Sequence, residues 1–188
     1  MIRRFNRYEL KYVIDARRYR RVVEDLRQFM VPDAYGDQEG FYRIVSLYYD
    51  SPGLSAYHSK LDGLLYRRKL RLRIYPPGGD VTRADKGLIE IKQRINRTVQ
   101  KRRLVLPLAE AEALCAGDPP ARELDELDAA VASEVQFMVR AQRLRPAAIV
   151  SYRRQAFMAE RYDSGMRVTF VMQLQGRTTS LKVNEDAK

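Results

Sequence analysis

The sequence has almost none of the residues on which several common kinds of site depend. It contains one cysteine, Cys115, one histidine, His58, and no tryptophan among its 188 residues. A single cysteine excludes an internal disulfide framework and suits a reducing compartment, and a single histidine excludes a multi-histidine zinc site. The small and apolar neighbours of Cys115 predict a packed thiol, and His58 is expected at the surface. The chemistry of the protein therefore lies with other residue types.

Long apolar runs are also missing. No stretch approaches the roughly 20 residues that span a bilayer, and the basic start lacks the apolar core of a signal peptide. The sequence therefore predicts a cytoplasmic protein with no transmembrane segment in this chain. No Ser–His–Asp or Cys–His set is evident. The segment 75–87 contains glycines but lacks the spacing of a phosphate-binding P-loop.

Positive charge, by contrast, is abundant. Lysine and arginine number 35 against 24 acidic residues, so the net charge is +11 and the sequence pI is about 9.9. Such a balance predicts an anionic partner, but composition does not separate phosphorylated small molecules, nucleic acid and a membrane surface. Hydrophobic residues make up 45% of the chain, enough for one domain with a real core.

The spacing of apolar residues predicts an α+β fold in which strands outnumber helices. Alternation with period two predicts strands over 5–14, 42–50, 69–75, 88–95, 98–106, 147–159 and 166–174. Helical spacing predicts helices over 15–30 and 54–63, and two more within 108–145. The segment 178–188 is expected to be a frayed tail. Hairpin-like neighbours favour a mostly antiparallel sheet.

Several of these strands share an unusual charged face. In "KLRLRIY", at 69–75, the cations alternate with apolar residues, so they project from one side of the strand. The same rule places Lys69, Arg71, Arg73, Glu90, Lys92, Arg94, Lys101 and Arg103 on charged faces. Any one such face is ordinarily the solvated side of an antiparallel sheet. Because like charges destabilise a sheet, the whole set favours a barrel with the charged side inward and helices outside.

Two carboxylates stand among these cations. Glu9 and Glu90 each precede a lysine by two residues, so carboxylate and ammonium share a strand face. Hard oxygen ligands of this kind suit Mg²⁺ or Mn²⁺ bound together with substrate phosphates. Alternatively, each glutamate neutralises the neighbouring cations. The spacing favours neither interpretation.

Seven segments, taken in order, resemble the VTC (vacuolar transporter chaperone) domain of the CYTH, or triphosphate tunnel metalloenzyme, superfamily. They are "RYELKY", "SLYYDSP", "YHSKLDG", "RRKLRLRIY", "IEIKQRINRTVQKRR", "SYRRQAF" and "MRVTF", and they run from about residue 3 to 174. The resemblance implies an antiparallel, tunnel-like β-barrel with helices packed outside. It also implies a single domain over 1–188 with a helical insertion at about 108–145.

The resemblance further implies a tunnel that binds ATP or another triphosphate. The most specific activity that it implies is ATP-dependent synthesis of inorganic polyphosphate with a divalent metal, Mg²⁺ or Mn²⁺. Other superfamily members hydrolyse triphosphates or cyclise ATP. A triphosphatase and a noncatalytic polyphosphate-binding module are therefore the alternatives. No nucleic-acid partner is expected, because no recognised nucleic-acid motif is present.

Matching the family motifs residue by residue gives a set of expected site residues. The expected catalytic residues are Lys11, Arg71, Arg73, Lys92, Lys101, Arg154 and Arg167. The same residues, together with Lys69, Arg94, Arg103 and Tyr152, are expected to bind substrate, and Glu9 and Glu90 to bind the metal.

Two departures from the family pattern bear on the metal more than on the anion. Val171 stands where the family usually has an aspartate. The chain also shows no equivalent of the final family strand, which carries a further glutamate and lysine.

Overall fold

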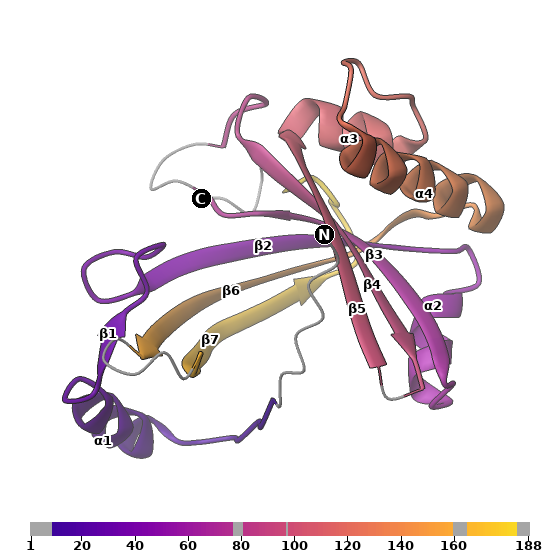
Figure 1. Ribbon diagram of the computed structural model, residues 1–188. Coiled ribbons are helices and arrows are strands. Elements are labelled where there is room, and N and C mark those ends of the chain that lie inside the picture. The colour runs from indigo at the N-terminus through magenta and orange to yellow at the C-terminus, as the bar shows by residue number, and fades with distance from the viewer. Residues whose placement is uncertain (1–8, 77–80, 97, 160–164, 184–188) are drawn as a thin grey trace. The chain divides into compact units, whose positions relative to one another are not determined.

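A computed structural model describes residues 9–76, 81–96, 98–159 and 165–183 (Figure 1). In chain order the elements are α1 (Ala16–Leu26), β1 (Met30–Pro32), β2 (Phe41–Asp50), α2 (Ser55–Leu61), β3 (Tyr66–Ile74), β4 (Lys86–Ile95), β5 (Thr98–Pro107), α3 (Leu108–Ala116), α4 (Glu126–Gln142), β6 (Arg145–Ala159) and β7 (Arg167–Arg177).

The chain divides into two compact units. The first unit joins Met1–Tyr42 with Arg153–Met172, and the second joins Arg43–Tyr152 with Gln173–Lys188. The strand order is β1-β6-β2-β3-β4-β5, and β7 pairs with β6.

The sheet of the second unit is antiparallel, and its register sets out the site. β3 pairs with both β2 and β4, and β4 pairs with β5. One row across these strands reads Tyr48, Arg71, Glu90 and Arg103. Because side chains in such a row project from the same face, residues far apart in the sequence become neighbours.

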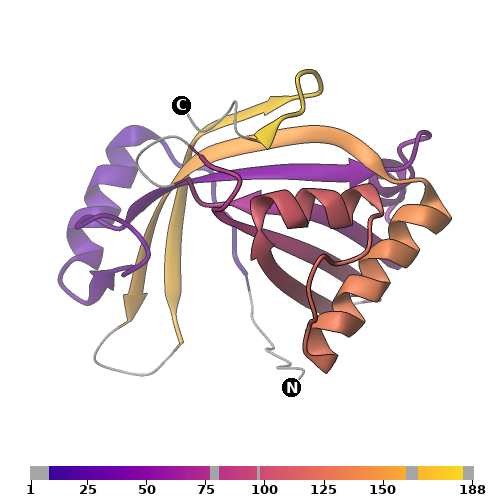
Figure 2. The ribbon, with the colours of Figure 1, turned by 90° about the horizontal axis from the view of Figure 1, so that it is seen from above.

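The other face of this sheet carries the core. Leu72, Ile89 and Leu104 are each fully buried on it. Helices α3 and α4 cover this face, as Figures 1 and 2 show, and α4 contributes the buried side chains of Val135 and Met138. The strands therefore have one face turned to helices and one face rich in charge. This is the division that the period-two pattern predicted for β3, β4 and β5.

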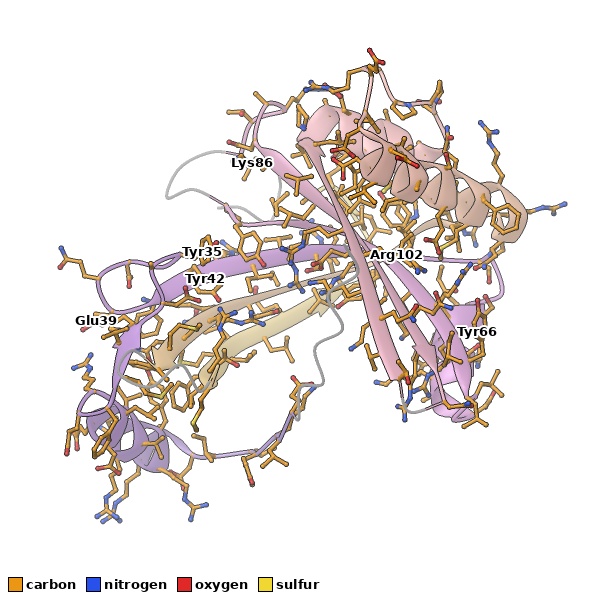
Figure 3. The ribbon with its side chains drawn as sticks, in the orientation of Figure 1. Tyr35, Glu39, Tyr42, Tyr66, Lys86 and Arg102 are labelled. Atoms are coloured by element: carbon orange, nitrogen blue, oxygen red, sulfur yellow. The ribbon has the colours of Figure 1, made fainter. Side chains whose placement is uncertain are left out.

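Two turns hold the ends of these strands. The carboxylate of Asp50, at the end of β2, accepts hydrogen bonds from the backbone N–H groups of Ser51, Ala56 and Tyr57, and so anchors the start of α2. Between β4 and β5, Asn96 adopts φ 53°, the left-handed conformation that asparagine tolerates better than most residues. Figure 3 shows Tyr66 and Lys86, which lie at opposite ends of the β3–β4 pair.

The first unit has a smaller core, built by α1 against β6 and β7. The carboxylate of Asp15 accepts from the backbone N–H of Arg18 at 2.7 Å and so caps α1, as expected. The ring of Tyr19 packs edge-on against Phe170, and Phe170 packs edge-on against Phe157. Helix α1 is shorter than predicted, because Met30 belongs to β1, which pairs with β6.

The predicted fold class is confirmed: the chain is α+β, with an antiparallel sheet and helices packed on it. The buried Cys115 thiol and the exposed His58 also lie as expected. None of the helices in the described ranges is long and apolar enough to cross a membrane. Organisation as a single domain over 1–188 stays a prediction.

Two predictions of local structure are wrong. Residues 9–14 form no strand, and residues 5–8 lie outside the described part of the chain. Leu10, Tyr12 and Val13 stay exposed, because alternation yields a strand only where a neighbouring strand supplies hydrogen bonds. Ile14 is partly buried and packs against the core of the first unit. The tail, over its described residues, is not frayed: Leu181 and Val183 pack against the core of the second unit.

Candidate functional site

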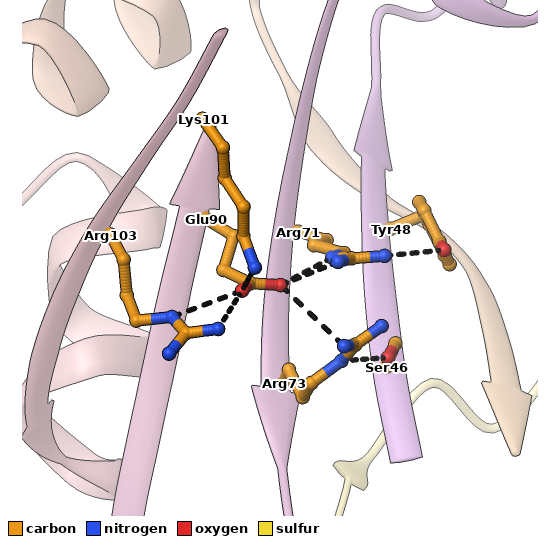
Figure 4. Close-up of polar contacts among 7 residues, drawn as sticks. All are labelled: Ser46, Tyr48, Arg71, Arg73, Glu90, Lys101 and Arg103. Atoms are coloured by element: carbon orange, nitrogen blue, oxygen red, sulfur yellow. Dashed lines mark hydrogen bonds and ion pairs between the residues drawn. The ribbon is translucent and has the colours of Figure 1, made fainter. Parts of the chain in front are cut away.

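The charged face of the second unit converges on one carboxylate. Glu90, on β4, has a side chain with no exposed surface (Figure 4). Its Oε2 accepts from Arg71 Nε at 2.6 Å and lies 3.9 Å from Arg73 Nη1. Its Oε1 accepts from Arg103 Nη2 at 2.8 Å and pairs with Lys101 Nζ. We call these five residues the Glu90 cluster: four cations meet one carboxylate, so its net charge is +3.

The four cations of the Glu90 cluster differ in how firmly they are held. Arg71 and Arg73 are nearly buried, and each has a second partner on β2. Arg71 Nη1 donates to the Tyr48 hydroxyl at 3.2 Å, and Arg73 Nε donates to Ser46 Oγ at 3.1 Å. Lys101 and Arg103 are 41% and 44% exposed. The first pair is therefore fixed, while the second pair reaches solvent.

The electrostatics of the Glu90 cluster follow from burial and charge. Burial disfavours the charged carboxylate of Glu90, but Arg71, Lys101 and Arg103 outweigh that cost and hold its pKa at about 2. Burial also lowers the pKa of Lys101; Glu90 opposes this, and Arg103 and Arg71 add to it. Burial works against the charge of Arg71, and Glu90 and Tyr48 more than offset it, so the pKa of Arg71 is raised.

The depressed pKa of Glu90 predicts a loss of stability in acid. The unfolded chain takes up this proton first, so Glu90 stabilises the fold fully above its ordinary pKa of 4.5 and loses that effect as the pH falls towards about 2. The loss is about 3 kcal/mol of unfolding free energy. Urea titrations of the wild type and of Glu90→Gln should show a gap that is wide near about pH 6 and narrows below about pH 4. An equal gap at both pH values would contradict the assignment.

A second row of cations lies beside the Glu90 cluster. Lys69, Lys92 and Lys101 are direct neighbours on β3, β4 and β5. Burial lowers the pKa of Lys69, and the charge of Lys60 lowers it further. Arg94 lies two residues further along β4, on the same face, and donates from Nε to the backbone carbonyl of Asn96 at 2.8 Å. Three ammonium groups in one row repel one another, so this row is suited to an anion.

The first unit holds two more of the expected site residues, in a cluster of its own. Arg167 Nη2 donates to the hydroxyl of Tyr42 at 2.7 Å and pairs with the buried carboxylate of Asp33. The guanidinium of Arg154 lies 5.9 Å from the centre of the Tyr42 ring. Tyr152, which the same motif selected, is half-buried in the second unit. The sequence pointed to neither Asp33 nor Tyr42.

Glu9 and Lys11 lie on the strandless segment that precedes α1. Their side chains are 71% and 77% exposed, and Lys11 Nζ lies 3.6 Å from Glu9 Oε1. An exposed pair of this kind contributes little to stability. Lys11 as a phosphate ligand and Glu9 as a metal ligand stay predictions.

Sequence reasoning also missed Tyr48 and Ser46, which fix the two buried arginines. Both lie in the strand predicted over 42–50, at positions of the same parity. The odd or even position of a residue along a strand gives the face of the sheet on which its side chain lies. It does not give the residue of β3 that lies opposite Tyr48 or Ser46. The register supplies that, placing Tyr48 opposite Arg71 and Ser46 opposite Arg73.

The surroundings of Glu90 do not fit a divalent cation. Both carboxylate oxygens already face two cationic groups each, so a metal would enter among four positive charges. At an effective dielectric constant of about 20, each unit-charge repulsion at about 4 Å costs about 4 kcal/mol. Across the described residues, no group of three or more His, Cys, Asp and Glu side chains is placed to hold a metal. Binding of Mg²⁺ or Mn²⁺ elsewhere in the protein stays a prediction.

The helix-covered face offers a matched contrast to the Glu90 cluster. There Glu134 of α4 pairs with Arg68 at 3.2 Å and with Arg102 at 2.6 Å, and Arg102 also donates to Gln93 at 2.6 Å. Here one carboxylate meets two cations, and an amide oxygen takes part. Glu134, Arg68 and Arg102 together have a net charge of +1, and they provide controls for substitutions in the Glu90 cluster.

Comparison with known proteins places the chain in a family. The sequence model described as the VTC domain matches residues 6–187. No curated protein matches. Among solved structures, a Bacillus halodurans protein described as a "putative adenylate cyclase" is similar, with a TM-score of 0.45 and 13% identity over 85% of this chain and 76% of that chain. Because the family model spans nearly the whole sequence, the chain belongs to the VTC domain family.

Proposed function

We propose that this chain binds the phosphate groups of a triphosphate or of polyphosphate on the charged face of its second unit, and that it transfers phosphoryl groups. The observation that carries the proposal is the Glu90 cluster with its row of lysines, where a net charge of +3 adjoins Lys69 and Lys92. Such a surface is costly unless an anion offsets it. Membership of the VTC domain family supports a triphosphate as that anion.

The buried and the half-exposed cations of the charged face would bind phosphate oxygens in different ways. Arg71 and Arg73 are planar donors fixed in direction by Tyr48 and Ser46, which suits paired hydrogen bonds to one phosphate group. Lys101 and Arg103 are half-exposed and adjust to the ligand, and Lys92 offers an exposed point charge beside them. Phosphoryl transfer needs mainly positioning and stabilisation of charge on the phosphate oxygens, which these groups supply.

The specific reaction that we propose is ATP-dependent synthesis of inorganic polyphosphate. In that reaction the end of a phosphate chain attacks the γ-phosphate of ATP and releases ADP. If water attacks instead, the protein is a triphosphatase. If neither attacks, it is a binding module. The charged face serves all three, so the nature of the acceptor decides among them. A cytoplasmic location fits the use of ATP and is proposed with it.

The test is an assay with ATP, run with Mn²⁺, with Mg²⁺ and without divalent metal. Polyphosphate resolved on a gel supports the polymerase. Orthophosphate alone supports the triphosphatase, and binding of tripolyphosphate without turnover supports the module. A protein that binds neither ATP nor tripolyphosphate under any of these conditions would refute the proposal. A Lys92→Met, Lys101→Met variant, which removes two charges from the lysine row, should lose activity and affinity together.

A further inference from the structure

The position of Glu90 raises a question that the proposed function leaves open. A phosphate-binding face gains nothing, at first sight, from a buried carboxylate at its centre, because a negative charge repels the ligand. A carboxylate in such a place would usually bind a metal ion, but the four cations around Glu90 would repel a divalent ion. Another role is therefore needed.

We propose that Glu90 is the internal counter-ion of the cluster, and that its carboxylate competes with phosphate for Lys101 and Arg103. This inference rests on the proposed function for the identity of the competing anion. In the free protein Glu90 occupies the place of a phosphate group and accepts the hydrogen bonds that a phosphate would accept. When phosphate binds, the half-exposed Lys101 and Arg103 turn to it, while Arg71 stays on Glu90.

The asymmetry of the two carboxylate oxygens carries the inference. Oε2 faces Arg71 and Arg73, which are nearly buried and are tied to β2 by Tyr48 and Ser46. Oε1 faces Arg103 and Lys101, whose side chains are 44% and 41% exposed. Oε2 therefore faces two arginines that each have a second partner, whereas Oε1 faces two half-exposed cations that are able to turn to a ligand. Figure 4 shows the two pairs on opposite sides of the carboxylate.

The net charge of the Glu90 cluster also supports the counter-ion role. Four unpaired cations within one cluster would destabilise the fold, so the free protein needs an anion there. A permanent glutamate supplies it and keeps the arginines aimed in the absence of ligand. The cost is weaker ligand binding, because the phosphate must replace an interaction that already exists. Removal of the negative charge should therefore weaken the free fold and strengthen anion binding. If Glu90 instead held a divalent metal, its removal would weaken anion binding in the presence of that metal.

The decisive variant is Glu90→Gln, studied by calorimetry with tripolyphosphate in buffer free of divalent metal. The glutamine amide still accepts from Arg71 through its oxygen, but its –NH₂ group donates and so releases Lys101 and Arg103. We expect tripolyphosphate to bind at least about tenfold more tightly than to the wild type. At low salt the melting temperature of the free variant should fall by about 5–10 °C, and added NaCl should restore most of the loss.

The matched control is Glu134→Gln, which removes a carboxylate that pairs two arginines on the helix-covered face. It should leave the affinity for tripolyphosphate within about twofold of the wild-type value. If Glu90→Gln does not fold, the double variant Glu90→Gln, Arg103→Gln replaces it. The double variant restores the net charge of the cluster to +3, so it should fold at low salt and bind tripolyphosphate about as the wild type does.

Direct binding of Mn²⁺ separates the two roles of Glu90. Weaker tripolyphosphate binding by Glu90→Gln, or wild-type Mn²⁺ binding that this variant loses, would overturn the inference. If the wild type binds neither tripolyphosphate nor ATP, with or without divalent metal, the proposed function fails and the competition fails with it. In that case a salt-reversible loss of melting temperature in Glu90→Gln still supports the counter-ion role, and an unchanged melting temperature overturns it.

Discussion

Replacement of Arg71 by glutamine is expected to weaken binding of tripolyphosphate by at least about 100-fold. Arg71 is the cation most firmly fixed in the Glu90 cluster, since it donates from Nε to Glu90 and from Nη1 to Tyr48. Truncation of one partner of a buried charge pair costs about 2–5 kcal/mol, and about 2.7 kcal/mol corresponds to 100-fold in affinity. Isothermal titration calorimetry at fixed ionic strength measures the loss.

The same strand offers the control for this prediction. Arg68→Gln removes the same charge from β3, but Arg68 lies on the helix-covered face and pairs with Glu134. Its effect on affinity should stay within about twofold, since the two sites do not share partners. Equal losses in both variants would mean that only the overall charge matters. That result would contradict a specific role for the charged face.

Replacement of Leu72 by alanine is expected to lower the free energy of unfolding by about 2–5 kcal/mol. Leu72 lies on β3 between the two cluster arginines in sequence, yet its side chain is fully buried against the helix-covered core. The substitution removes apolar contacts and leaves a cavity that the sheet and α3 cannot fill. Urea denaturation followed by circular dichroism provides the measurement.

Leu127→Ala, on the exposed side of α4, is the matched control. The side chain of Leu127 is 65% exposed, so its truncation should change stability by about 0.5 kcal/mol or less. If Leu72→Ala were equally mild, the two faces of β3 would be assigned the wrong way round. Arg71 would then point into the core, and the Glu90 cluster would not be a site.

The sequence was sufficient to predict which residues share a face. Period-two alternation in 69–75, 88–95 and 98–106 assigned Arg71, Glu90 and Arg103 to the charged side, and the structure agrees. Alternation succeeds here because each strand has one face against a hydrophobic core, which fixes the side-chain parity. Helix α1 was found for a similar reason, since Asp15 caps a segment with an apolar stripe.

Register was not predictable from the sequence, and the site depends on it. The row from Tyr48 to Arg103 exists because four strands align in one particular way, and a shift by two residues would keep every parity and dissolve the cluster. The failure over residues 9–14 has a related cause. Alternation there is present in the sequence, but a strand requires a partner, and side chains such as Val13 remain exposed.

The central claim is that the charged face of β3, β4 and β5 is where phosphate groups bind. A crystal structure of the protein with tripolyphosphate tests it most directly. Phosphate oxygens within hydrogen-bonding distance of Arg71, Lys101 and Arg103, with the latter two turned away from Glu90, would be the predicted result. Tripolyphosphate bound elsewhere, with all four cations still on Glu90, would contradict the claim.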